Sequence, residues 1–109
     1  DMREREIAIH KEEIRLGKVF ENLESNKKVV VKQLISRAAF LTITLQELED
    51  EINDNGSTEK TMSGGTKQTA AATAHIAMTK NLSTIMKQLL DLVPAEKKQK
   101  SRLQELRDE

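Results

Sequence analysis

The side chains that could carry chemistry are few and scattered. The chain has two histidines, His10 and His75, and no cysteine. Neither histidine has a second His or Cys at the spacing of a metal-ligand set, and no nucleophile can be paired with a base. We therefore expect no catalytic residue, no metal, no cofactor and no small-molecule substrate. His75 is interpreted as a surface or partly buried polar group.

The segment from Gly64 to Lys67 (GGTK) weakly resembles a phosphate-binding loop. A Walker motif needs a glycine, four residues and then Gly-Lys-Ser/Thr, directly after a strand. Here Lys67 follows Thr66, and no strand is expected before the segment. An exposed connector is the better interpretation.

Positive charge gathers in two clusters. The denser contains Lys97, Lys98, Lys100 and Arg102, and the other contains Lys27, Lys28 and Lys32. Both are candidate contacts to duplex DNA, because Lys and Arg neutralise phosphates and release counterions. The alternative for the denser cluster is a solvated tail, the usual fate of a charge run. The chain has 18 basic and 18 acidic residues, and this neutrality argues against a high-affinity nucleic-acid surface on a single copy.

The composition indicates long helices with narrow apolar stripes. The 109 residues include two phenylalanines but no tryptophan or tyrosine, and 33% are charged. Aromatic side chains usually dominate a large core, so a thick globular core is not expected. No apolar run approaches the ~20 residues of a membrane span, and no secretory signal pattern opens the chain. The lack of cysteine fits a reducing compartment, so we expect a cytoplasmic protein without membrane partners.

The first expected helix runs from Arg3 to Leu23. Its apolar side chains share one side at helical spacing; they are Ile9, Leu16, Val19, Phe20 and Leu23. Gly17 weakens this helix by ~1 kcal/mol relative to alanine. Ser25 and Asn26 are expected to end and cap it.

The second expected helix, Lys27 to Asn53, has two apolar faces. The continuous stripe consists of Val31, Leu34, Ile35, Ala38, Leu41, Leu45, Leu48 and Ile52. Val29, Phe40 and Ile43 lie about half a turn away. A helix with two apolar faces needs two neighbours, so these three residues are the candidate oligomer interface. The alternative is that the first helix of the same chain covers them.

A third expected helix, Ala70 to Val93, follows a loop over Asp54–Thr69 and ends before Pro94. Thr66 or Thr69 can cap its start. Antiparallel packing on the second helix would bury Leu41, Leu45, Leu82, Ile85 and Leu89 against each other. The prediction is one all-α domain, 1–109, that assembles into an oligomer: an N-terminal helix (1–26), a long helical hairpin (27–94, loop 54–69) and a charged tail or short helix (95–109).

Three segments resemble the small terminase subunits of tailed phages and prophages of Gram-positive bacteria. Thr79–Lys98 (TKNLSTIMKQLLDLVPAEKK) is similar to their C-terminal helix, and Arg37–Gly56 (RAAFLTITLQELEDEINDNG) to the helix before it. Ser63–Thr69 (SGGTKQT) resembles their connecting loop, although Met62 and the following alanine run depart from that pattern.

The resemblance implies a non-catalytic DNA-packaging component. Small terminases assemble as rings, bind viral duplex DNA and regulate a large subunit that carries the ATPase and nuclease. Homo-oligomer subunits, duplex DNA and a large terminase subunit are therefore the expected partners. Ring assembly would let several weak basic arms act together. The alternative is a cytoplasmic helical scaffold or coiled-coil adaptor with protein partners only, which the stripe spacings and the neutral charge support equally.

Overall fold

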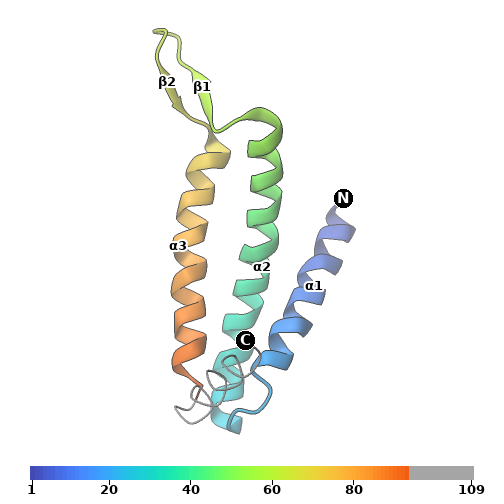
Figure 1. Cartoon of the computed structure of the whole chain (residues 1–109). Helices are drawn as coiled ribbons and strands as arrows, with labels where there is room; N and C mark the ends of the chain where they lie inside the picture. Colours follow the sequence, from blue (N-terminus) through green and yellow to red (C-terminus); the bar gives the residue numbers. More distant parts are fainter. Residues whose placement is uncertain (94–109) are drawn as a thin grey trace, which may run out of the picture.

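The part of the chain that the structure describes consists of three helices and one small β-ribbon (Figure 1). A computed structural model of the chain describes residues 1–93. The elements are α1 (Met2–Val19), α2 (Ser25–Asn55), β1 (Thr58–Lys60), β2 (Thr66–Gln68) and α3 (Ala70–Asp91). The structure is 76% helical, which confirms the predicted helical class and adds a two-stranded sheet.

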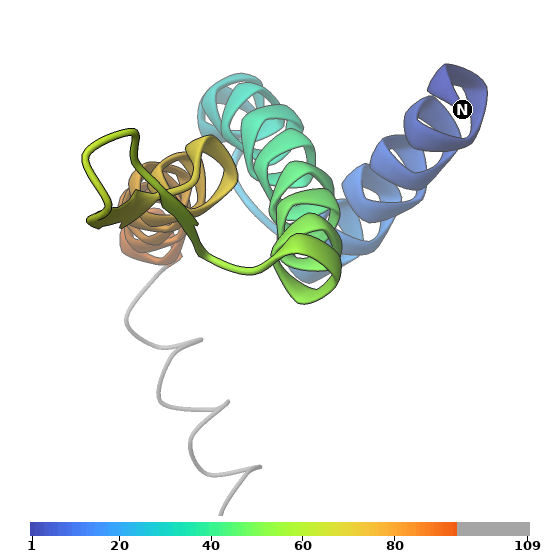
Figure 2. The same cartoon turned by 90° about the horizontal axis from the view of Figure 1, so that it is seen from above.

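Helix α2 is the middle of the three. It runs antiparallel to α3 on one side, and α1 leans away from it on the other (Figures 1 and 2). The end of α3 lies beside the start of α2, where the Lys27 ammonium donates to the Leu92 carbonyl at 3.5 Å. The three helices therefore converge at the end of the molecule that holds the α1–α2 turn.

Helix α1 ends four residues before the predicted position. Asp1 caps its start by accepting from the Arg3 backbone N–H at 3.1 Å, and the chain turns after Val19. Val19 is 64% exposed, so its predicted place on the apolar side is wrong. The buried side is set by Leu16 and Phe20, and Val19 points about 100° away from Phe20.

The prediction that Ser25 and Asn26 end the first helix is also wrong. Both are the first residues of α2, and the extended residue before them, Glu24, is the N-cap without a side-chain hydrogen bond. At the other end α2 continues to Asn55, two residues past the predicted Asn53. Gly56 ends it with φ 85° and ψ 169°, a conformation essentially reserved for glycine.

The core lies where the three helices converge. Its buried members are Leu16, Phe20, Leu23, Val31, Ile35, Ala38 and Leu89. Of the five residues predicted to be buried between the second and third helices, Leu45 and Leu89 are buried, and Leu41, Leu82 and Ile85 are half-buried. Leu45 lies outside the main cluster. The apolar contacts therefore concentrate at one end and thin out toward the ribbon.

The predicted loop 54–69 contains a β-hairpin. Strands β1 and β2 pair antiparallel, with Glu59 opposite Lys67 and their side chains 3.5 Å apart. Gly64 supplies a positive φ of 90° at the turn. Every strand residue is exposed, so no alternation of polar and apolar residues revealed the strands in the sequence. Thr69 then caps α3, as predicted, by accepting from the Ala72 N–H at 3.2 Å.

Helix α2 is long and apolar enough, by length and composition, to cross a membrane. The core helix of a soluble protein passes the same test. In this structure the apolar stripe of α2 packs on α1 and α3, where Val31, Ile35 and Leu45 are buried. Of the most apolar 18-residue window of α2, 28% is buried inside the structure.

Candidate interaction surfaces

The second apolar face of α2 is only partly covered. Val29 is 65% exposed and Phe40 is 45% exposed, while Ile43 is half-buried. The structure thus leaves Val29 and Phe40 available to another molecule. Phe40 also borders a shallow hollow between α2 and α3, together with Leu41 and Ile85.

The N-terminal half of α1 reaches the same face through one arginine. The Arg5 guanidinium lies 4.9 Å from the centre of the Phe40 ring. It also donates to Glu47 at 2.8 Å and to the Thr44 hydroxyl at 2.6 Å. Arg5 therefore holds the N-terminal half of α1 against α2. Few apolar side chains are buried in this part of α1.

The three lysines at the start of α2 have different surroundings. Lys27 is half-buried and donates to the Leu92 carbonyl, so it stabilises the exposed carbonyl end of α3. Lys28 and Lys32 are exposed and line a groove that also contains Glu13 and Glu21. The groove therefore holds side chains of both signs, although no ion pair joins these lysines to these glutamates within residues 1–93. The other predicted DNA cluster, Lys97, Lys98, Lys100 and Arg102, lies outside the described residues.

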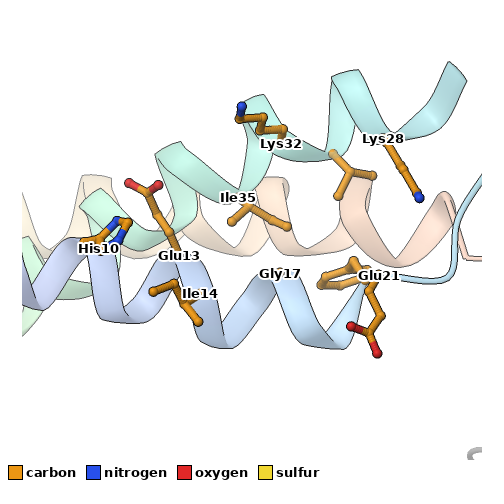
Figure 3. Close-up of a pocket in the computed structure, with 10 residues that line it drawn as sticks. His10, Glu13, Ile14, Gly17, Glu21, Lys28, Lys32 and Ile35 are labelled. Carbon is orange, nitrogen blue, oxygen red and sulfur yellow. The ribbon is translucent and has the colours of Figure 1, made fainter. Parts of the chain in front are cut away.

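A groove of about 430 Å³ separates the C-terminal half of α1 from the start of α2 (Figure 3). Its floor is apolar and is formed by Ile14, Phe20, Val31 and Ile35. Gly17 lies at the centre of the α1 wall, and a Cβ added there would meet nothing within 4 Å. Composition and periodicity did not predict this groove, because it depends on how far α1 diverges from α2.

The histidines lie on different surfaces. The His75 ring nitrogen Nε2 is 3.2 Å from a Glu49 carboxylate oxygen and links α3 to α2. His10 lines the groove beside α1. Within residues 1–93 no group of three or more His, Cys, Asp or Glu side chains could hold a metal ion. Gly64–Lys67, which weakly resemble a phosphate-binding loop in sequence, lie in the turn and the second strand of the ribbon.

An exposed ion pair on α1 raises the pKa of Arg15. The pKa of the Arg15 guanidinium is raised because it donates hydrogen bonds to the Glu12 carboxylate and is attracted to its charge. Both residues lie on α1 three positions apart. An exposed pair at this spacing is an ordinary helix contact, so it marks no reactive site.

No family model, curated protein or solved structure matches this chain.

Proposed function

We propose that the chain is a non-catalytic, small-terminase-like component of a viral DNA-packaging machine. In this proposal it forms a homo-oligomeric ring, binds viral duplex DNA and regulates a large terminase subunit in the host cytoplasm. The sequence resemblance of residues 37–98 supports the assignment. The observation that carries it is the two-sided α2, whose stripe packs on α3 while Val29 and Phe40 stay exposed.

A ring follows from an α2–α3 helical hairpin with a second apolar face. The buried stripe would hold the hairpin together within one subunit, and the exposed face would contact the next subunit. Such a contact joins different surfaces of neighbouring subunits, and contacts of this kind that close generate rings. Hairpins side by side would then build the ring wall.

The DNA contact is proposed to lie first in the tail cluster. Lys27 is engaged with Leu92, and Lys28 and Lys32 share their groove with two glutamates. Lys97, Lys98, Lys100 and Arg102 thus remain the densest candidate set. Assembly would bring one such cluster from each subunit together, so weak single contacts sum to useful affinity.

The assembly is tested by replacing both Phe40 and Ile43 with Lys. We expect the oligomer to dissociate, because charge is introduced into the subunit contact, while circular dichroism still shows a helical protein. Mass in solution is measured by sedimentation. Leu90→Lys is the matched control, since Leu90 is an equally exposed apolar residue on α3. A wild-type monomer at micromolar concentration would rule out the ring.

DNA binding is tested by duplex titration at two salt concentrations, with the tail intact and with residues 97–109 deleted. Affinity should fall steeply with salt, because phosphate contacts release counterions. Deletion should weaken binding about equally for all duplex sequences, because phosphate contacts position the protein without specifying bases. Unchanged binding after deletion would move the contact to the N-terminal half.

The second candidate function is a helical scaffold or adaptor with protein partners only. The two glutamates that line the same groove as Lys28 and Lys32 favour it, as does the neutral whole-chain charge. The same titration decides between the two functions. An oligomer that binds no duplex at low salt would support the adaptor and contradict the packaging proposal.

A further inference from the structure

One exposed side of α1 carries a strip of regularly spaced residues. These residues do not belong to the second apolar face of α2 described above. Arg3, Ile7, His10, Ile14 and Gly17 follow each other at spacings of four, three, four and three, and Glu21 continues the series in the turn after α1. This is the heptad spacing of a helix that packs along another helix. Ile7 and Ile14 are 47% and 48% exposed, so the strip has no complete cover within residues 1–93.

The strip is complementary to itself when read in the opposite direction. An antiparallel copy places Arg3 opposite Glu21, Ile7 opposite Gly17, and His10 opposite Ile14. Both ends then hold an Arg–Glu pair, and Ile7 meets Gly17, which leaves room for it. Neither the Arg3 nor the Glu21 side chain forms an ion pair within the described part of the chain.

Gly17 is the strongest sign of a close neighbour. Glycine inside a helix costs roughly 0.5–1 kcal/mol relative to alanine, yet no atom of residues 1–93 lies near enough to require it. The missing side chain opens the α1 wall of the groove at its centre (Figure 3). A helix packed there could approach more closely than a side chain would allow.

We propose that α1 pairs antiparallel with α1 of a second copy about a two-fold axis, with Ile7 of each copy packed on Gly17 of the other. The charges around the groove fit this occupant. By helical geometry the exposed Glu6 lies between the strip and the side of α1 that packs on α2. An antiparallel partner would therefore bring its own Glu6 to the side of the groove that holds Lys32. This contact is separate from the proposed ring face on α2. If both form, two rings join face to face.

The first test uses charge exchange. Arg3→Glu and Glu21→Arg each place like charges at both ends of the pair, and each should weaken self-association roughly tenfold. The double exchange restores opposite charges and should restore association. In sedimentation the mass should halve for each single variant and return for the double one. An unchanged mass in both single variants would overturn the proposal, whether or not the ring forms.

The second test uses matched apolar positions. Ile7→Lys should halve the mass of the assembly, whereas Val19→Lys, an exposed apolar residue on another side of α1, should leave it unchanged. Val29→Lys reports the ring contact without removing the Phe40 ring that Arg5 of α1 contacts, so failure of one contact is distinguishable from failure of the other. Equal effects of Ile7→Lys and Val19→Lys would mean that α1 is only generally sensitive to charge.

The third test uses the absence of natural cysteines. Lys11→Cys lies close to the level of the proposed two-fold axis, so a short thiol-reactive bifunctional crosslinker should link two copies. Lys18→Cys is the control, because its two copies would lie roughly 20 Å apart along the antiparallel pair. Crosslinking at position 18 without crosslinking at position 11 would exclude the antiparallel register.

Discussion

At the scale of single residues, burial differs sharply between neighbours. Leu89 is fully buried in the core where the three helices converge, and Leu90 beside it is 52% exposed. Phe20 is the only aromatic residue in this core. With so few large side chains buried, each one accounts for a large share of the apolar area that the fold removes from water.

Leu89→Ala should lower the free energy of unfolding by roughly 2–5 kcal/mol, because it removes buried methyl groups and leaves a cavity. Leu90→Ala is its control and should cost under about 1 kcal/mol, since surface changes are usually small. Urea titrations followed by circular dichroism measure both. A loss below half a kilocalorie at Leu89 would contradict its place in the core.

Arg5→Ala should release the N-terminal half of α1 from α2. The substitution removes the ring contact with Phe40 and the hydrogen bonds to Glu47 and Thr44. The ion pair is partly exposed, so global stability should fall by no more than about 1 kcal/mol. Hydrogen exchange should quicken in the first turns of α1 and stay unchanged in α3. Arg3→Ala is the control, because Arg3 makes no side-chain contact to α2 within the described residues.

At the scale of elements, short local features set where helices begin and end. Thr69 caps α3 through its hydroxyl, and Gly56 ends α2 with a backbone conformation closed to other residues. The two features flank the β-ribbon, so they fix the direction in which it leaves the helices. Every strand residue of the ribbon is exposed, so side-chain burial adds little to hold that direction.

Gly56→Ala should destabilise the protein by about 1–3 kcal/mol, the usual cost of forcing a side chain into this region of φ and ψ. The added Cβ would lie 4.0 Å from the Thr58 carbonyl, so backbone strain and not a clash is the cause. Gly65→Ala is the matched control. Gly65 has no positive φ, and its added Cβ would make an ordinary 3.5 Å contact with the Thr61 hydroxyl. Thermal unfolding should separate the two variants, and equal midpoints would argue against this turn geometry.

At the scale of the whole molecule, the three helices are packed firmly at one end and loosely at the other. The core cluster joins α1, α2 and α3 where they converge. Toward the ribbon, α2 and α3 are linked by Leu45 and by the His75–Glu49 pair, and α1 is held through Arg5. Partners are therefore expected to act on the open end and on the groove, where apolar residues remain exposed.

The chain should fold without lipid or detergent, because the apolar stripe of α2 is covered by α1 and α3. Circular dichroism in plain buffer should show a largely helical protein, consistent with the 76% helix of the structure. Adding neutral lipid vesicles should neither raise the helix content nor carry the protein into the pellet on centrifugation. Helix formation that depends on vesicles would mean that α2 is a membrane segment.

The sequence by itself determined the helical class and the main stripe of α2, because apolar residues at spacings of three and four fall on one face of a helix. It also limited the cap of α3 to Thr66 or Thr69, since capping depends on one side chain and its nearest backbone, and the structure shows that Thr69 is the cap. It placed the start of α2 at Lys27, two residues after the observed start at Ser25, and it missed the ribbon. Ser25 suits a helix start as well as a stop, and strands of three exposed residues carry no burial pattern.

Only the tertiary structure decided which apolar residues stay exposed to solvent. The angle between α1 and α2 brings Arg5 onto Phe40 and leaves Val29 uncovered. The same angle opens the groove beside Gly17. At the end of α3, the Leu92 carbonyl accepts a hydrogen bond from Lys27. Periodicity assigns a residue to one side of its own helix, but the neighbour that covers that side is set by how helices cross. That crossing depends on contacts between residues far apart in the sequence.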